Sequence, residues 1–395
     1  MISLRPTLLA GAALLTAGCA QLPPQRFELA RSAAIDAAIG AVVAARGMPG
    51  AQFRLERAGM VYEHSYGRLS YDDGAAAVGP DTVYDIASLT KVVATAPAVL
   101  LLAEQGKLEL DAPLLRYFPE CGNGGKEAIT LRHLLTHSSG LPSGLPALPA
   151  WQGDAAAHAL ACAQRVTHAP GTMFRYSDIN FILLGQLVQK VSGEPLEQFA
   201  RRAIFAPLGM DATGYLPPRA AGIAPTQRAA GAGAHADLAA GQLLQGVVHD
   251  PSARRMGGVA GSAGLFSTAR DLARFARMLL GGGQLDGVRV LSAASVRLLS
   301  TPQSPPGLAE LRGLGMDIDS PFARPRGSLY PVGSYGHTGF TGCVLWIDPA
   351  SASFYVLLSN RVYPDDKSNI LPLYGQLGTL AAEAVRAAPP IPAPF

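Results

Sequence analysis

Apolar and polar positions near the start of the chain follow first a helical and then a strand pattern. Apolar residues recur at helical spacing over about residues 29–46, where a glycine and a proline end the pattern, so we expect a helix there. Residues 51–56 and 60–66 are rich in strand-forming side chains and flank a possible turn at 57–59. This arrangement predicts two antiparallel strands joined by that turn.

A second helix is predicted where an extended stretch, residues 82–86, meets a long apolar segment from Val92 to Leu102. An apolar run of that length in a globular chain is typical of a buried helix. Ser88 then lies at the start of the helix, next to its unpaired backbone N–H groups. Pro97 falls inside the same helix and is expected to kink it, because proline removes one backbone hydrogen bond.

The middle of the chain differs from both ends. From Leu114 to about Leu244, short helical segments alternate with loops of Gly and Pro, and strand patterns are almost absent. Strand and helix patterns return after Gly261 and predict a helix at 269–280, strands at 335–339, 343–347 and 354–358, and a last helix at 371–387. The strands at 343–347 and 354–358 are expected to be joined by a turn around 348–350. We therefore expect an α/β plus α protein, in which a helical domain is inserted into an α/β domain.

These patterns divide the chain into consecutive parts with different expected roles. They are an export signal at 1–19, a tether at 20–28, a discontinuous sheet domain at 29–113 and 245–388, a helical domain at 114–244 and a proline-rich tail at 389–395. Loops at 138–150 and 220–245 are rich in turn-forming or small residues. We expect these two loops to shape a pocket, because binding residues are often carried on loops.

The first nineteen residues have the pattern of an export signal. Arg5 precedes a short apolar run, Leu8 to Leu15, which is too short to span a bilayer, and small residues then lead to Cys19. Small residues before a cysteine resemble the bacterial lipobox, in which that cysteine is lipidated. Thr16 stands where leucine is usual, so cleavage by an ordinary signal peptidase is the alternative, and a mature N-terminal helix is a second one. Either cleavage predicts an exported, periplasmic protein, and lipidation would anchor it to a membrane.

Composition narrows the function classes further. With 395 residues, 49% apolar and 15% charged residues and a net charge of +3, the chain is typical of a globular protein. Its basic residues are scattered along the sequence, which does not favour nucleic-acid binding. The spacing of cysteine and histidine predicts no metal site. Cys121 and Cys162 could form a disulfide in an oxidising compartment, whereas His133 and His137 are expected to orient a helix end and its loop.

The chemistry of the chain is expected at Ser88-Leu89-Thr90-Lys91. A lysine three residues after a serine lies one helical turn further along the same face. A serine hydroxyl becomes a nucleophile when a neighbouring base takes its proton, and burial can lower the pKa of a lysine. The alternative is an N-cap serine followed by a solvent-facing lysine, so the spacing needs partners elsewhere in the chain.

Such partners occur as Tyr176-Ser177-Asp178 and His337-Thr338-Gly339. Together with Ser-x-x-Lys, they resemble the penicillin-recognising serine hydrolases, which include class C β-lactamases, D-alanyl-D-alanine carboxypeptidases, D-aminopeptidases and related esterases. The similarity runs from about residue 30 to 385 and includes 131–141, 191–196, 207–210 and 336–349. It implies a β-lactamase/transpeptidase-like fold, with an antiparallel sheet flanked by helices and an inserted all-helical domain.

The resemblance also implies roles for individual residues and requires no cofactor and no metal. Ser88 is the acylated nucleophile, and Lys91 and Tyr176 share its proton, with either one as the first acceptor. The backbone N–H groups of Ser88 and Phe340 form the oxyanion hole. Thr338 and the strand around it pair with the substrate, as in strand addition.

His337 is a departure from the family pattern, because β-lactamases have lysine in Lys-Thr-Gly. Histidine is only partly charged near neutral pH, so a permanent cation for a substrate carboxylate is missing at this position. Gly339 completes the motif as in the family.

Asp178 is a second departure, because Tyr-x-Asn is usual in the family. A carboxylate cannot donate the hydrogen bond that an asparagine amide gives to a substrate carbonyl. Asp178 could instead pair with Lys91, which would raise the lysine pKa and move the proton-accepting role towards Tyr176. The alternative is a helix N-cap for the N–H groups of 179–181.

The sequence therefore predicts an exported serine hydrolase that acts through an acyl-enzyme on a cell-wall D-amino-acid peptide or on a small ester or amide. Both departures argue against efficient β-lactam hydrolysis. The alternatives are a weak β-lactamase and a penicillin-binding sensor or scaffold that acylates without turnover. Expected partners are a small-molecule or peptidoglycan-peptide substrate and, through Cys19 only, a membrane; the sequence does not predict an oligomeric state.

Overall fold

The computed structural model describes residue 27 and residues 29–218, 222–233 and 236–388. The predicted export signal with Cys19, all but residue 27 of the tether, and the tail at 389–395 lie outside the described residues. The domain boundaries given above stay a prediction.

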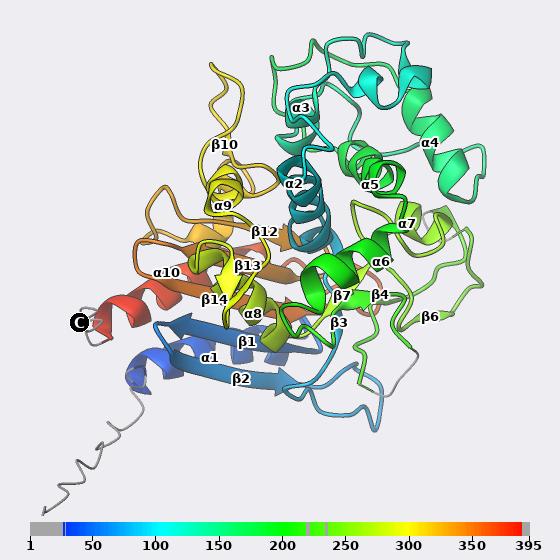
Figure 1. The fold of residues 1–395 in the computed structure, drawn as a ribbon. Coiled ribbons are helices and arrows are strands. Elements are labelled where there is room, and N and C mark those ends of the chain that lie inside the picture. The colour runs from blue at the N-terminus through cyan, green and yellow to red at the C-terminus, as the bar shows by residue number, and fades with distance from the viewer. Residues whose placement is uncertain (1–26, 28, 219–221, 234–235, 389–395) are drawn as a thin grey trace, which may run out of the picture.

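A seven-stranded antiparallel sheet forms the centre of the molecule (Figure 1). Its strands, in spatial order, are β10 (Leu311–Arg312), β11 (Asp317–Asp319), β12 (Tyr335–Gly339), β13 (Cys343–Asp348), β14 (Ser353–Ser359), β1 (Gly50–Arg57) and β2 (Met60–Gly67). The predicted hairpin of β1 and β2 is confirmed, with Arg57 opposite Met60. The predicted pairing of β13 with β14 is confirmed as well, with Asp348 opposite Ser353.

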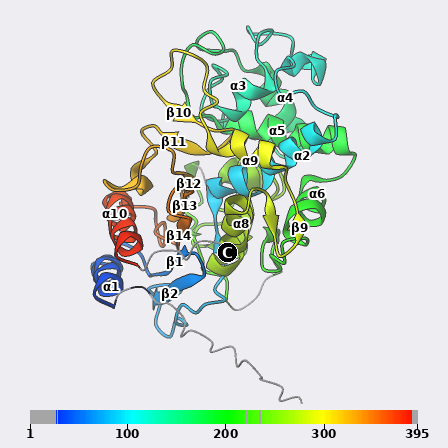
Figure 2. The ribbon, with the colours of Figure 1, turned by 60° about the vertical axis from the view of Figure 1, so that its left-hand side comes forward.

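Helices cover both faces of this sheet. α1 (Leu29–Ala44) and α10 (Leu371–Ala387) pack against one another on one face, and α8 (Ala269–Leu280) contacts β1 and β14 on the other (Figure 2). Alternate residues of a strand point to opposite faces: Trp346 packs in the core under α1 and α10, and Leu345 in the core that includes α8. The sheet is therefore buried on both sides, as its continuous apolar strands require.

The remaining helices lie beside the sheet, around the buried helix that follows Ser88. They are α2 (Ala96–Glu104), α3 (Leu131–Leu135), α4 (Asp154–Ala163), α5 (Asp178–Ser192), α6 (Leu196–Ala200), α7 (Pro251–Arg255) and α9 (Ala293–Ser300). α5 packs directly on α2 and on the turn before it. This contact brings the start of α5, and with it Asp178, towards Lys91.

Several further strands of two or three residues form small sheets; those at Tyr84–Asp85 and Leu265–Ser267 lie where extended or strand patterns were expected, and the others were not predicted. β3 (Tyr84–Asp85), β7 (Leu265–Ser267) and β4 (Gly214–Tyr215) form a small sheet, β5 (Gln227–Arg228) pairs with β6 (Leu243–Leu244), and β8 (Gln284–Leu285) pairs with β9 (Val288–Arg289). The expectation of an all-helical segment at 114–244 is therefore wrong at β4, β5 and β6. Strands of two residues are too short to show an alternating pattern.

The helix after Ser88 also differs in detail from its prediction. A 3₁₀ turn at Ala87–Leu89 and a π-helical turn at Lys91–Thr95 lead into α2. Pro97 therefore lies in the first turn of α2 instead of in the middle of an α-helix. Proline is tolerated there, because its missing N–H is not needed at the start of a helix.

Among the described residues, Ala87–Glu104 is long and apolar enough to cross a membrane. However, 78% of that stretch is buried inside the protein, which is typical of a core helix.

Candidate active site

Ser88 is presented by a turn that other segments hold in place. Ala87 has φ 46°, a conformation that non-glycine residues rarely adopt, and its N–H donates to Asp85 Oδ1 at 2.8 Å. The second oxygen of Asp85 accepts from the backbone N–H of His249 at 2.7 Å. Burial raises the pKa of the Asp85 carboxyl to about 6. Asp85 thus fixes the turn that carries Ser88 to the segment before α7.

Lys91 is fully buried and makes three polar contacts. Its Nζ donates to Ser88 Oγ at 3.0 Å and to the carbonyl of Ser262 at 2.8 Å, and it lies 2.7 Å from Asp178 Oδ1. Burial lowers the pKa of Lys91, but its interactions with Asp178 and Tyr176 outweigh burial and raise it. The amine therefore stays protonated and acts as a hydrogen-bond donor to Ser88.

Asp178 contacts Lys91 and does not cap α5. α5 begins at Asp178 itself, the residue in the N-cap position is Ser177, and neither a Ser177 cap bond nor an Asp178 bond to residues 179–181 occurs. The side chain of Asp178 is 34% exposed, so one part of it faces the cleft. Of the two alternatives for this residue, the ion pair is the one found.

Tyr176 lies in a group of aromatic and histidine rings. Its ring centroid is 4.4 Å from that of His137, 5.1 Å from that of Phe322 and 5.9 Å from that of His337. Lys91 Nζ is 5.1 Å from the centroid of the Tyr176 ring. The structure thus brings together Ser88, Lys91, Tyr176 and His337, which lie far apart in the sequence.

His137 and His133 have the structural roles expected of them. The buried His137 accepts a hydrogen bond from the backbone N–H of Ser177 at 3.1 Å, and so positions the residue that follows Tyr176. His133 accepts from the backbone N–H of Thr130, and Thr130 in turn caps α3.

β12 lies directly against the turn before Ser88. A Cβ added at Gly339 would come to 2.4 Å from the carbonyl oxygen of Ile86, so only glycine fits there. Thr341 Oγ1 donates to the carbonyl of Asp85 at 2.7 Å. These contacts fix Phe340, the predicted second donor of the oxyanion hole, relative to the Ser88 turn.

His337 is buried, and its Nδ1 lies 2.7 Å from the carbonyl oxygen of Thr338. Burial, followed by the positive charges of Arg312 and Lys91, lowers the pKa of His337 well below its ordinary value. The ring is therefore neutral near pH 7, with Nδ1–H donating to Thr338. A substrate carboxylate would find no positive charge on this residue.

Sequence reasoning missed two charged residues near the site, Arg312 and Asp317. Both are buried, on β10 and β11, and Arg312 Nη1 lies 3.4 Å from Asp317 Oδ1. Arg312 is the largest charge contribution to the low pKa values of His137 and His337. The only sequence signal was a pair of charges in an otherwise apolar stretch, and no motif marks it.

Two cavities adjoin the predicted binding elements. The smaller, about 320 Å³, is lined by Phe322, Thr338, Phe340, Arg361 and Tyr374 among others, and so borders the strand predicted to bind substrate. The larger, about 840 Å³, is lined by Ala147–Gln152 on one side and by parts of 233–255 on the other. Both loops that were expected to shape a pocket thus contribute to the wall of a cavity.

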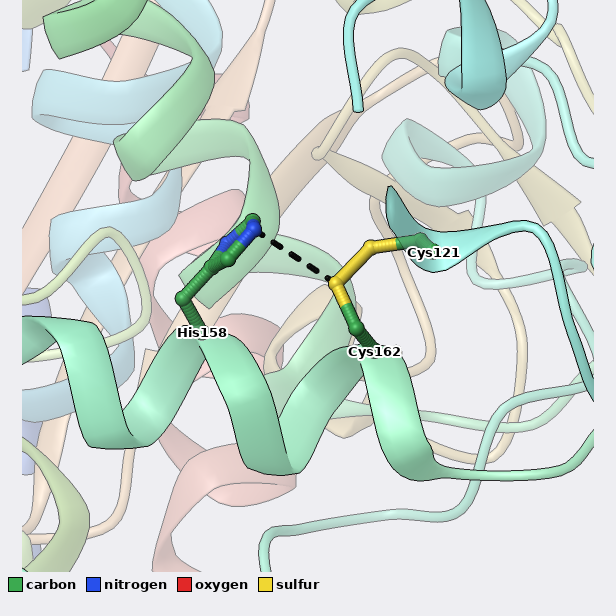
Figure 3. A group of neighbouring side chains, drawn as sticks. All are labelled: Cys121, His158 and Cys162. Atoms are coloured by element: carbon green, nitrogen blue, oxygen red, sulfur yellow. Dashed lines mark hydrogen bonds between the residues drawn. A yellow bond between two sulfur atoms is a disulfide. The ribbon is translucent and has the colours of Figure 1, made fainter. Parts of the chain in front are cut away.

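Cys121 and Cys162, for which the sequence left a disulfide open, do form one, and it joins the turn before residue 122 to the end of α4 (Figure 3). His158 Nε2 lies 3.5 Å from Cys162 Sγ and 2.9 Å from Glu120 Oε1. These side chains have the composition of a metal site. Because the two sulfur atoms are bonded to one another, they are not available as thiolate ligands.

Comparisons with known proteins agree with this geometry. The "Putative D-alanyl-D-alanine carboxypeptidase" of Escherichia coli K12 is 31% identical over 340 residues, which cover 76% of each chain. Among solved structures, EstCE1, "a hydrolase with promiscuous acyltransferase activity", has a TM-score of 0.70 at 20% identity and covers 90% of this chain and 98% of its own.

A penicillin-binding protein homologue from Caulobacter crescentus has a TM-score of 0.69 at 22% identity and covers 90% of this chain and 97% of its own. Both structural matches show the β-lactamase/transpeptidase-like fold, and the family model named Beta-lactamase matches residues 35–377. The chain therefore belongs to the beta-lactamase family of serine hydrolases.

Proposed function

We propose that the protein hydrolyses an ester or amide through an acyl-enzyme on Ser88. The observation that carries this proposal is the contact of Ser88 Oγ with a protonated Lys91, which is itself paired with Asp178. A hydroxyl that accepts a charge-assisted hydrogen bond is oriented and becomes easier to deprotonate.

In the proposed mechanism Tyr176, as phenolate, takes the proton of Ser88 while Oγ attacks the substrate carbonyl carbon. The backbone N–H groups of Ser88 and Phe340 bind the oxyanion of the tetrahedral intermediate. The intermediate collapses as the bond to the leaving group breaks, and the proton on Tyr176 passes to that group. Water then attacks the acyl-enzyme, loses its proton to Tyr176 and releases the acid, while Ser88 recovers its proton.

Tyr176 is preferred over Lys91 as the proton acceptor because Lys91 remains charged. A lysine that donates to Ser88, Ser262 and Asp178 has no lone pair to accept a proton. Lys91 lies close enough to the Tyr176 ring to stabilise a phenolate. In the proposed mechanism, Lys91 is therefore the cation and Tyr176 is the base.

Among substrates, we favour an ester with an uncharged leaving group. Asp178 cannot donate to an acyl-side amide carbonyl, and His337 is neutral and buried. Arg361, which lines the cavity beside Thr338, is already paired with Asp366 at 2.6 Å. The aromatic rings of Phe322 and Phe340 border the same cavity and suit an apolar group.

A cell-wall D-amino-acid peptide is the second candidate. It is favoured by the 31% identity to a protein named as a carboxypeptidase and by the export pattern of residues 1–19. In line with that pattern, we propose a periplasmic location with a lipid anchor at Cys19. The substrate is then the peptide of peptidoglycan, and the membrane is a partner only through the anchor.

The test compares the wild type with Ser88→Ala by intact mass after incubation with a fluorophosphonate and, separately, with a penicillin. A Ser88-dependent adduct with the fluorophosphonate alone, together with turnover of p-nitrophenyl esters, supports the esterase. An adduct with both reagents supports the peptidase. Acylation without any turnover would instead indicate a penicillin-binding sensor, and no adduct with either reagent contradicts the proposed function.

A further inference from the structure

Arg312 is a buried cation whose partners compensate its charge only in part. Its side chain is fully buried on β10. Nη2 donates to the carbonyl of Gly315 at 2.8 Å, whereas Asp317 Oδ1 is 3.4 Å from Nη1. Nε and Nη1 have no hydrogen-bond partner among the described residues. A bidentate arginine–carboxylate pair would use these nitrogens, so this pair leaves part of the positive charge exposed to its surroundings.

Those surroundings are the rings around Tyr176. The Arg312 guanidinium carbon lies 5.5 Å from the centroid of Phe174, and the Phe174 ring meets the His137 ring edge-on at 6.4 Å. The His137 ring lies against the ring of Tyr176. Apolar and neutral rings thus lie between the guanidinium and the tyrosine. These rings screen the positive charge of Arg312 much less than water would.

We propose that Arg312 is a positioning residue for Tyr176, and that its buried guanidinium supplies the permanent positive charge on the tyrosine side of the cleft. It acts through space, because a fully buried side chain cannot touch the substrate. The charge favours the phenolate of Tyr176 and adds to burial in keeping His137 and His337 neutral. The inference rests on the proposed role of Tyr176 as base.

The charges that face Tyr176 come from several elements, and each affects the expected pH dependence. They are Lys91 before α2, Asp178 on α5, His137 after α3, Arg312 on β10, Asp317 on β11, His337 on β12 and, through Asp178 and Lys91, Asp250 before α7. The Lys91–Asp178 pair is close to neutral overall. Removing Arg312 therefore removes the cation of this set whose carboxylate partner, Asp317 at 3.4 Å, makes no hydrogen bond to it.

The experiment measures kcat/KM for a neutral p-nitrophenyl ester against pH in the wild type, Arg312→Met, Arg312→Lys and Asp317→Asn. In Arg312→Met we expect the acidic limb of the profile, where kcat/KM rises with pH, to shift to higher pH by about one unit. At a given pH on that limb, kcat/KM is then about tenfold lower than in the wild type. Arg312→Lys keeps the charge and should restore most of the wild-type profile. Asp317→Asn removes the counter-charge, so its acidic limb should move to lower pH.

A second readout follows Tyr176 directly. The tyrosinate absorbance of each variant is titrated with and without Tyr176→Phe, so that the difference reports the ionisation of Tyr176. We expect this ionisation to move in the same direction as the kinetic limb. A matched control is Arg326→Met, since Arg326 pairs with Asp319 at 2.7 Å and is not among the charges that face Tyr176. Its profile should match that of the wild type.

The proposal is overturned if folded Arg312→Met keeps the acidic limb of the wild type, whatever its kcat. If Arg312→Met does not fold, the Asp317→Asn variant becomes the test. An acidic limb that stays in place or shifts to higher pH in Asp317→Asn contradicts the proposal. A purely structural role would lower the melting temperature in both variants without moving either profile. Failure of the proposed function is recognised separately, because the wild type would then not be labelled at Ser88 by a fluorophosphonate.

Discussion

Lys91 and Arg312 are both fully buried cations beside the same cleft, yet their surroundings differ. Lys91 has a carboxylate at 2.7 Å and two oxygen acceptors within 3.0 Å, and Asp178 and Tyr176 raise its pKa despite burial. Arg312 has one close acceptor and a carboxylate at 3.4 Å, and burial lowers its pKa. Burial alone therefore does not determine the role of a cation. Lys91 acts through direct contacts, whereas Arg312 acts through the electrostatic field of its charge.

The largest effect on activity is expected at Lys91, which acts through direct contacts. Lys91→Met removes the donor to Ser88 and should lower kcat/KM by about 10³-fold, within the range for loss of a positioned acid or base. Lys126→Met is the matched control, because Lys126 is also buried but donates to Asn123. Steady-state kinetics should show the loss only in Lys91→Met, and an equal loss in both would mean that packing, and not contact, is responsible.

The disulfide lies apart from both cations. Its removal is therefore expected to change the stability of the fold but not the catalytic activity. It closes a loop with a sequence separation of 41 residues, which in the chain-entropy description stabilises the fold by about 4 kcal/mol. Cys121→Ser with Cys162→Ser should therefore lower the free energy of unfolding by roughly 3 to 4 kcal/mol, as measured by urea denaturation. The activity of the folded fraction should not change, and a large fall in its kcat would disprove this separation.

The buried His337, near Arg312, should also affect how the free energy of unfolding depends on pH. His337 has a folded-state pKa below its unfolded value, so its contribution is present above about pH 6.5 and is lost as the pH falls. Between pH 7 and 5 the wild type should lose about 2 kcal/mol more than His337→Gln, because one buried imidazole accounts for up to about 1.4 kcal/mol per pH unit. Equal losses in urea unfolding at the two pH values would contradict the neutral state of His337.

The smallest effect is expected when the ion pair is changed but Lys91 is kept. Asp178→Asn should lower kcat/KM for a neutral ester about tenfold, equivalent to about 1.4 kcal/mol, because Lys91 loses the charge that holds it. The melting temperature should fall as well, because the buried Lys91 loses its counter-charge, although Asp178 caps no helix. A lower melting temperature with unchanged kinetics would assign Asp178 a structural role instead.

Sequence patterns mark the residues that contact one another at the site, but no sequence pattern marks Arg312. Ser88 and Lys91 are linked by local helical spacing, and Tyr176 and His337 lie in short motifs, so each could be found without the fold. Arg312 has no such spacing, because its proximity to Tyr176 depends on how β10 packs against Phe174, in the segment before α5. A charge that acts across a tertiary contact leaves no pattern along the chain.

Other differences have similar physical causes. The choice between an ion pair and an N-cap at Asp178 depended on where α5 begins, and helix ends are uncertain by one or two residues in a sequence. Pro97 could be placed within a helix, but the π-helical turn before it depends on packing that the pattern of apolar residues does not encode. The sheet hairpins were predicted correctly because their strands are long enough to show strand patterns and their turns are short.

The close approach of Gly339 to Ile86 has a mechanical consequence for this family member. The nucleophile turn and the substrate-binding strand share a rigid wall, because any side chain at Gly339 would collide with the backbone carbonyl of Ile86. Adjustment to substrates of different width then falls to other segments, such as the loops at 147–152 and parts of 233–255 that line the larger cavity. Variation in those loops can change which molecules fit while the spacing of the reacting groups is preserved.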